Sequence, residues 1–293
     1  MAEMTAKQQS VLNRAVDELA AVPGIRAVVL GGSFARGVAR ADSDIDVGIY
    51  YRESEPFSID HLTEIARELH DSSDPVVSGF HEWGPWVNGG AWLTVEGQRV
   101  DFLYRSLDQW DRVQQEASSG RYELHFGQQP PFGFFSPTYL GEMRIAVAMV
   151  DESSDVASRK RLVDEFPDAL RRSIVQNCLW GVEFGLGAFA PKFAAANDTL
   201  GVAGCLTRFA YFLVLSMFAL NRQYLVNDKT ALAEIAGFEQ VPDDFVGRVS
   251  RLLANAGSTT PELQASLEQM RLLHQDVVQL AGEGYRSNRS PGR

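Results

Sequence analysis

VVLGGSFARGVARADSDIDVGIYY (residues 28–51) is the stretch that decides which fold the sequence predicts. It begins within the apolar, β-branched run IRAVVL at 25–30, which is typical of a buried strand. It ends in a second strand-like run, DIDVGIYY, at 44–51. Between the two runs the chain passes through the small residues GGS at 31–33. We therefore expect two strands joined by a glycine turn and a short turn or helix.

The flanking segments predict the rest of a small sheet domain. Thr5 and Gln8 have the spacing of a capping box, and apolar residues follow them at helical intervals. SIDHLTEIARELH, 58–70, places its apolar residues on one helical face. GAWLTVEGQRVDFLYRS, 90–106, alternates apolar and polar residues around a turn at 96–97, which predicts a hairpin.

The second half of the chain has almost only helical periodicity. It is expected to form helices over 139–150, 159–195, 200–224, 228–236, 243–255 and 261–281. A Gly/Pro/aromatic linker, GQQPPFGFFSP, precedes these segments at 127–137. The predicted fold class is α+β: a small mixed β-sheet domain over 1–130, an all-α helical-bundle domain over 138–281 and a disordered tail over 282–293.

Composition excludes several classes of protein. The net charge of −11 argues against a dedicated nucleic-acid binder, because such proteins neutralise phosphates with Lys and Arg. The start of the chain does not resemble a signal peptide, so we expect a cytoplasmic protein. The most apolar run, 209–220, is too short to span a bilayer and predicts a buried helix. Cys178 and Cys205 are expected to be buried free thiols.

Two carboxylates in the opening stretch have the spacing that brings them together. Residues i and i+2 of a strand point to the same side, so Asp44 and Asp46 should project together. Adjacent carboxylates repel unless a cation lies between them, and Mg²⁺ prefers carboxylate oxygens. The glycine turn and the Ser33 hydroxyl offer donors to a phosphate. Together these features indicate phosphoryl or nucleotidyl transfer with two metal ions about 4 Å apart.

A third carboxylate is expected from Asp101, in RVDFLY, on a strand that should be buried on one face. It would be the ligand of a second metal ion or the base for the acceptor, because a carboxylate in such a run needs a compensating partner. An ion pair with Arg99 or Arg36 is the structural alternative. Asp42, in the turn before the second strand, is expected to be a solvated loop residue.

The pattern of GGS, ten residues, DID and a later aspartate on a strand resembles the catalytic signature of the polymerase-β-like nucleotidyltransferase superfamily. With a helical second domain, the chain resembles the antibiotic nucleotidyltransferases. The segments WGPWVNGGAWL at 83–93 and FALNRQYLVNDK at 218–229 resemble an uncharacterised bacterial group of nucleotidyltransferase-domain proteins. The catalytic resemblance covers about residues 25–105, and the looser likeness extends to about residue 235.

This resemblance implies roles for individual residues. Asp44, Asp46 and Asp101 would bind Mg²⁺, two ions in all. Gly32 and Ser33 would bind the nucleotide triphosphate.

The resemblance also points to two positions further along the chain. Lys229 matches the lysine that reaches the triphosphate from the helical domain in streptomycin-type enzymes. Those enzymes use a glutamate as the base in an LQFGEW-like segment, whereas this chain has LHFGQQ, with Gln128 in that place. The base is then Asp101, His125 or another glutamate such as Glu82.

The function implied is transfer of a nucleoside monophosphate, AMP from ATP, to a hydroxyl of a small molecule such as an aminoglycoside-like compound, with release of pyrophosphate. A monomer is favoured over a homodimer, and no membrane or nucleic-acid partner is expected. One alternative keeps the fold and modifies a protein or a tRNA, as toxin–antitoxin nucleotidyltransferases do. The other is a non-catalytic nucleotide-binding regulator. The tryptophan-rich loop 81–92 is expected either to close the sheet by packing or to stack against an acceptor or a base.

Overall fold

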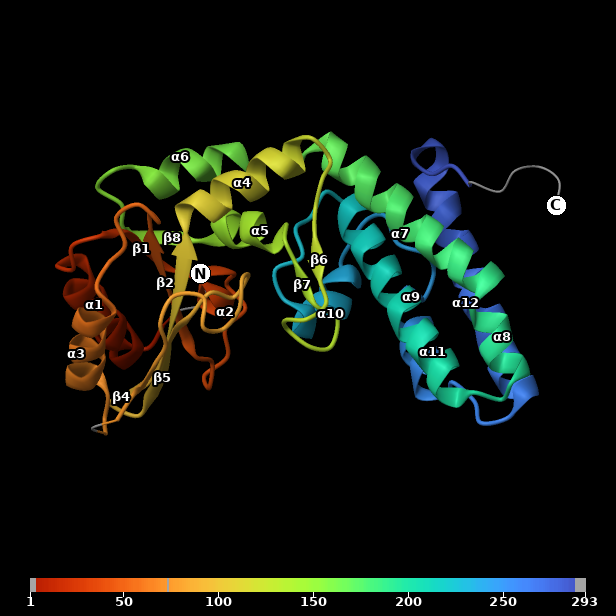
Figure 1. Cartoon of the computed structure of the whole chain (residues 1–293), viewed down its shortest axis with the longest axis horizontal. Coiled ribbons are helices and arrows are strands. Elements are labelled where there is room, and N and C mark those ends of the chain that lie inside the picture. The colour runs from red at the N-terminus through yellow and green to blue at the C-terminus, as the bar shows by residue number, and fades with distance from the viewer. Residues whose placement is uncertain (1–3, 73, 288–293) are drawn as a thin grey trace. The chain divides into compact units, whose positions relative to one another are not determined.

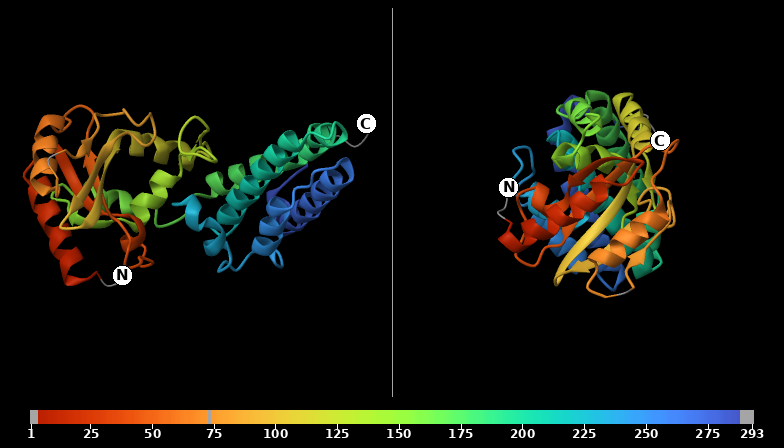
Figure 2. Two further views of the ribbon diagram at one scale, coloured as in Figure 1. Left: turned by 90° about the horizontal axis from the view of Figure 1, so that it is seen from below. Right: turned by 90° about the vertical axis from the view of Figure 1, so that its left-hand side faces the viewer.

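The computed structural model describes residues 4–72 and 74–287 and divides the chain into two compact units (Figures 1 and 2). The first unit comprises Met1–Glu116 and Tyr122–Glu165, and the second comprises Ala117–Arg121 and Phe166–Arg293. The first contains a six-stranded sheet, and the second contains only helices among the residues described. The predicted α+β class, with a mixed sheet followed by a helical region, is confirmed.

The sheet of the first unit has the strand order β3-β4-β5-β2-β1-β8. Its strands are β1 (Ile25–Leu30), β2 (Ile45–Tyr51), β3 (Val76–Val77), β4 (Gly90–Val95), β5 (Gln98–Ser106) and β8 (Val147–Val150). The pair β2 and β5 is parallel, and every other neighbouring pair is antiparallel. The predicted hairpin is β4–β5, whose turn residues Glu96 and Gly97 both have positive φ, as a tight hairpin turn requires.

One face of this sheet carries the core. The helices of the first unit are α1 (Ala6–Ala20), α2 (Gly32–Ala35), α3 (Ile59–Leu69), α4 (Leu107–Ser118), α5 (Thr138–Ile145) and α6 (Asp155–Leu162). The predicted capping box of Thr5 and Gln8 begins α1. The apolar faces of α1 and α3 join alternate strand residues, including Ile45, Val47 and Ile49, in one cluster. Because strand side chains alternate, the residues between them face the other way.

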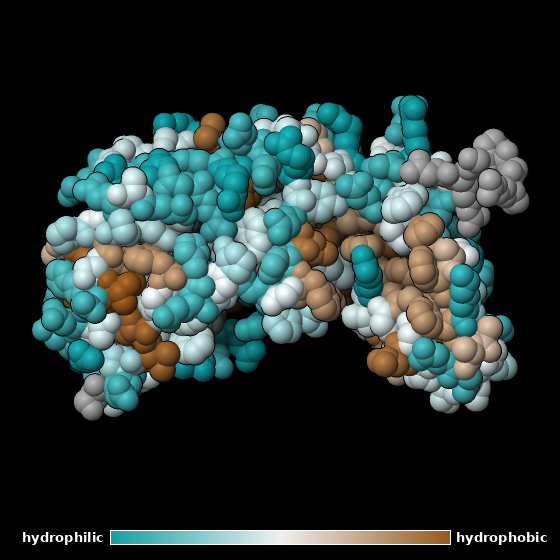
Figure 3. Space-filling model, in the orientation of Figure 1, coloured by the Kyte–Doolittle hydropathy of each residue, from teal (hydrophilic) through white to brown (hydrophobic). Residues whose placement is uncertain are grey.

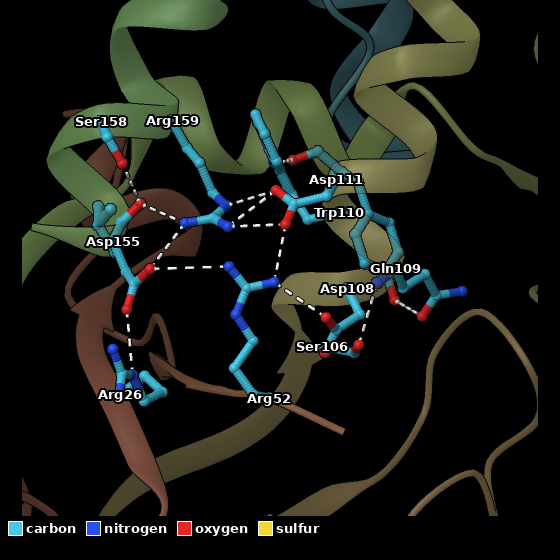
Figure 4. A network of polar contacts seen from close by, with 12 residues as sticks. Arg26, Arg52, Ser106, Asp108, Gln109, Trp110, Asp111, Asp155, Ser158 and Arg159 are labelled. Atoms are coloured by element: carbon cyan, nitrogen blue, oxygen red, sulfur yellow. Dashed lines mark hydrogen bonds and ion pairs between the residues drawn. The ribbon is translucent and has the colours of Figure 1, made fainter. Parts of the chain in front are cut away.

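A charged network joins α4 and α6 to the sheet (Figure 4). The Arg159 guanidinium donates to both oxygens of Asp111 on α4, at 2.9 Å each, and to Asp155 at its own helix start. Arg52, just after β2, donates to Asp111 at 2.8 Å and to Asp108 at 2.9 Å. Three arginines, counting Arg26, thereby balance three aspartates.

The second unit is a bundle around two long helices. Its elements are α7 (Asp168–Ala188), α8 (Ala190–Ala195), α9 (Thr199–Leu220), η1 (Asp228–Thr230), α10 (Ala231–Ile235), α11 (Phe245–Ala254), α12 (Thr260–Ala281) and η2 (Gly282–Gly284). Among the described residues, only α9 is long and apolar enough to cross a membrane, and 67% of its apolar window is buried within the protein. Cys178 and Cys205 are both free, as expected, although only Cys178 is fully buried. Hydrophobic side chains also reach the surface over this unit (Figure 3).

The structure corrects the predicted elements at several places. The predicted helix 139–150 contains only α5, and β8 follows it as a sheet strand paired with β1. Helix α4 was not predicted, and the linker 127–137 contains β7 (Phe134–Phe135), which forms a hairpin with β6 (Leu124–His125).

Two further corrections concern the second half of the chain. The predicted helix 159–195 is broken between Leu162 and Asp168, at Pro167. The predicted tail begins with η2 and the buried Tyr285, and residues 288–293 lie outside the described part of the chain.

Candidate functional site

Two of the predicted carboxylates lie side by side on the sheet. In the parallel pair β2–β5, Asp46 is directly opposite Asp101. Their strand neighbours Ile45 and Val100 are fully buried against the core. Since side chains alternate along a strand, Asp46 and Asp101 stand on the other face, which we call the carboxylate face.

The glycine turn after β1 lies directly against Asp46. The Gly31 N–H donates to the Asp46 carbonyl at 2.8 Å, and Gly32 has a φ of +56°. A Cβ atom on Gly32 would lie only 1.7 Å from Asp46 Oδ2. Glycine is therefore required here by space and by backbone conformation. Ser33 follows in the first turn of α2 and is half-buried.

The electrostatics of Asp46 reflect this crowding. Burial raises the pKa of Asp46 to about 7, with further contributions from the charges of Asp101, Asp44 and Glu142 and an opposing one from Arg105. Neighbouring carboxylates disfavour each other's ionised form unless a cation offsets them. This position therefore favours a cationic ligand.

Asp44, predicted as a metal ligand, contacts an arginine. Arg99, named as an ion-pair partner for Asp101, lies with its Nε 2.5 Å from Asp44 Oδ1. The contact is an ion pair that lacks hydrogen-bond geometry, and the Asp44 oxygen is itself buried. In residues 4–72 and 74–287, no three His, Cys, Asp or Glu side chains are grouped so that they could hold a metal ion as they stand. Asp46 and Asp101 supply adjacent oxygen ligands of the kind that Mg²⁺ prefers, while Asp44 is engaged by Arg99.

A fourth carboxylate near Asp46 was missed by sequence reasoning. Glu142, on α5, accepts hydrogen bonds from Arg105 at 2.7 and 2.9 Å. Burial alone would lower the pKa of Arg105, but the Glu142 carboxylate outweighs it and raises that pKa. Arg105 lies four residues after Asp101 on β5, hence on the carboxylate face. No local signal marks this pair, because 37 positions separate its members.

The residues that the sequence suggested as the base for the acceptor, and Gln128 in the place of the family's glutamate, lie in different parts of the first unit. Gln128 accepts from the Trp86 N–H at 2.9 Å and donates to the Trp83 carbonyl, so it fixes the tryptophan-rich loop. His125 Nδ1 lies 3.6 Å from a Glu123 carboxylate oxygen. Glu82 is exposed in the loop. Asp101 is the member of this set that the sheet register places beside Asp46.

Lys229 belongs to the second unit. It lies in η1, where the Asn227 side chain accepts from its backbone N–H at 2.8 Å. Its neighbour Asp228 is partly buried, and this burial raises the pKa of its carboxyl group. A role for Lys229 in binding triphosphate stays a prediction.

The glycine turn provides a matched pair of substitutions. Gly32→Ala should displace the Asp46 carboxylate and weaken the binding of a divalent cation at the carboxylate face by about 10²-fold, because the new Cβ needs the place of Asp46 Oδ2. Gly31→Ala should bind as wild type does, because its Cβ would meet Asp46 no closer than 3.7 Å. Calorimetric titration of both variants checks this prediction. Equal affinities would show that the position of the Asp46 carboxylate does not matter.

Comparison with known proteins agrees with this geometry. Residues 11–85 match the family model of the nucleotidyltransferase domain. The match includes the glycine turn, Asp44 and Asp46 and ends before Asp101. This part of the chain is thus a nucleotidyltransferase domain of the polymerase-β-like superfamily, as the sequence predicted.

Several solved structures are similar to this chain, and one of them covers most of its length. A nucleotidyltransferase-like protein from Exiguobacterium sibiricum is similar at a TM-score of 0.46 and 10% sequence identity, over 95% of this chain and 78% of that one. The sequence matches no curated protein.

Proposed function

We propose that the protein is a Mg²⁺-dependent nucleotidyltransferase that moves AMP from ATP to a hydroxyl group of a small molecule. The observation that carries this proposal is the register of β2 and β5, which sets Asp46 beside Asp101 and against the glycine turn. A donor-rich turn and a pair of carboxylates meet the two needs of this reaction, holding phosphate and neutralising it.

The proposed site residues divide between phosphate binding and metal binding. The backbone N–H groups at Gly32 and Ser33 and the Ser33 hydroxyl would bind the triphosphate. Asp44, Asp46 and Asp101 would hold the metal ions, which when bound neutralise phosphate charge.

In the proposed reaction, the acceptor oxygen forms a bond to the α-phosphorus. The bond from that phosphorus to the bridging oxygen breaks, and pyrophosphate leaves. Asp101 would accept the acceptor's proton.

The donor set fits a divalent cation, subject to one rearrangement. To bind a metal ion, the Asp44 carboxylate has to give up its ion pair with Arg99. The exchange replaces one cation by another at the Asp44 carboxylate, and the released Arg99 side chain, already 65% exposed, passes into solvent.

The acceptor is proposed to be a small molecule such as an aminoglycoside-like compound. A net charge of −11 favours a cationic acceptor over a polyanion such as tRNA. A monomeric, cytoplasmic enzyme accords with the sequence-based expectations.

The experiment that tests the proposal is titration of the full chain with each of the four nucleoside triphosphates, with and without Mg²⁺. We expect one triphosphate, ATP, to bind only with Mg²⁺ and, once an acceptor is supplied, to release pyrophosphate. Binding of ATP that is indifferent to Mg²⁺, without any pyrophosphate release, would instead indicate a nucleotide-binding regulator. Failure of all four to bind would refute the proposal.

A further inference from the structure

The carboxylate face continues beyond Asp101 into an exposed tryptophan. In the antiparallel pair β4–β5, Trp92 is directly opposite Asp101. Opposite residues of neighbouring strands share a face, so the indole stands beside the carboxylate, with Cβ atoms about 5 Å apart. Trp92 is 53% exposed, whereas its neighbours Ala91 and Leu93 are buried in the core. Tryptophan is enriched at binding interfaces, so an exposed indole beside polar groups offers a contact surface to a ligand.

A second tryptophan covers one side of this indole. Trp83 stacks on Trp92 with ring centroids 4.8 Å apart and planes 23° apart. It also lies over Gly90, where a Cβ would come within 3.0 Å of its ring. Trp92 is thus supported on one side while half of its surface stays open to solvent.

The loop that carries Trp83 is fixed by hydrogen bonds. The Trp83 N–H donates to the Asn88 carbonyl at 2.8 Å, and the Trp83 carbonyl accepts from Gln128. The Asn88 side chain is completely buried, donates to the Tyr51 hydroxyl at 2.8 Å and accepts from the His81 N–H at 2.9 Å. The stacked pair is therefore held in place before any ligand arrives, which lowers the entropic cost of binding.

The order of the strands gives this pair its place in the proposed reaction. Across the sheet the carboxylate face presents Trp92 on β4, Asp101 on β5 and Asp46 on β2, followed by the glycine turn after β1. The attacking and leaving oxygens lie roughly in line in such transfers. If the leaving phosphates occupy the glycine turn, the acceptor approaches from the side of β5 and β4.

On these grounds, and resting on the proposed function, we propose that the stacked indoles Trp83 and Trp92 are the acceptor platform. The acceptor lays a ring against Trp92 and directs its hydroxyl toward Asp101. A cationic ring compound fits this platform, because an indole face attracts ammonium groups and the neighbouring strands carry Asp101 and Asp46.

The test uses two ring compounds of similar size as probes: kanamycin, a polyol with ammonium groups, and raffinose, a neutral trisaccharide. Each is titrated by calorimetry into the full-length protein with Mg²⁺ and a non-hydrolysable ATP analogue. We expect kanamycin to bind and raffinose to bind at least about tenfold more weakly. Trp92→Leu, which keeps apolar volume but removes the ring, should weaken kanamycin binding about tenfold or more. Trp92→Phe should retain part of the affinity.

Thr94→Val is the matched control, because Thr94 lies on the same strand and face as Trp92. It should bind kanamycin as wild type does. Thermal unfolding checks that all three variants fold, which we expect because Trp92 is half-exposed.

The inference is overturned if kanamycin fails to bind wild type at millimolar concentration, if it binds no better than raffinose, or if Trp92→Leu leaves its affinity within about twofold. The titration with Mg²⁺ and ATP on wild type reports separately on the proposed function. If wild type binds ATP with Mg²⁺ as expected but the kanamycin titrations contradict the inference, the protein is a nucleotidyltransferase whose acceptor binds elsewhere.

Discussion

Asp46→Asn is expected to abolish Mg²⁺-dependent binding of ATP and to lower nucleotide transfer by about 10³-fold. Asparagine has the shape of aspartate but no charge, and the lost electrostatic contribution to a transferring phosphoryl group is of that size. The side chain has no substitute on its own strand, because the next residue on the same face of β2 is Gly48. Calorimetry with ATP and an assay of pyrophosphate release measure the two effects.

Asp42→Asn is the matched control for that variant. Asp42 lies in the connection just before β2, four residues before Asp46, but its side chain is 80% exposed and pairs only loosely with Arg40, at 3.6 Å. It should bind ATP and release pyrophosphate as wild type does. A folded Asp46→Asn protein that retains wild-type affinity would contradict the proposed site. We also expect Asp46→Asn to raise the free energy of unfolding, since it removes a buried charge from among other carboxylates.

Arg159→Met is expected to lower the free energy of unfolding of the first unit by about 2–4 kcal/mol. The Arg159 side chain is only 8% exposed, and its removal leaves Asp111 and the nearly buried Asp155 without their main cation (Figure 4). Breaking a fully buried ion pair costs about 3–5 kcal/mol. The expected loss is somewhat smaller here, because Arg52 and Arg26 keep their contacts with the aspartates.

Urea denaturation followed by tryptophan fluorescence measures this effect. Four of the five tryptophans, Trp83, Trp86, Trp92 and Trp110, lie in the first unit, so the signal reports mainly on it. Arg40→Met, which removes a solvent-exposed ion pair of the same unit, should change stability by less than about 1 kcal/mol. An Arg159→Met loss no larger than that of the control would mean that the network contributes little.

Local sequence signals were sufficient for the strands around the candidate site. The run 25–30 is β1 to the residue, and the hairpin turn at 96–97 was located by its glycine and by alternation of apolar residues. Both signals depend on neighbours within a few positions, which a single sequence reveals. The spacing of Asp44 and Asp46 is likewise local, but it placed both residues on the strand, whereas β2 begins at Ile45 and only Asp46 belongs to it.

The features that were missed depend on distant partners. β8 is four residues of VAMV, which continue the apolar pattern of α5, and only pairing with β1 makes it a strand. Glu142 belongs to the site through its contact with Arg105. The pairing of Arg99 with Asp44 depends on how the hairpin lies beside β2. Such contacts are consequences of tertiary structure, which no window of sequence contains.

The late strand β8 also has a consequence for how the protein is made. β1 lies between β2 and β8, so its outer edge stays unpaired until residues 147–150 have been synthesised. At about 5–20 residues per second, the ribosome needs roughly 5–20 s to proceed from the end of β2 to the end of β8. During that interval the residues of β1 that later pair with β8, Val28, Val29 and Leu30, have unpaired backbone groups that another polypeptide chain can bind. Other nascent chains on the same messenger RNA are therefore the nearest molecules that can pair with the open edge of β1 before β8 does.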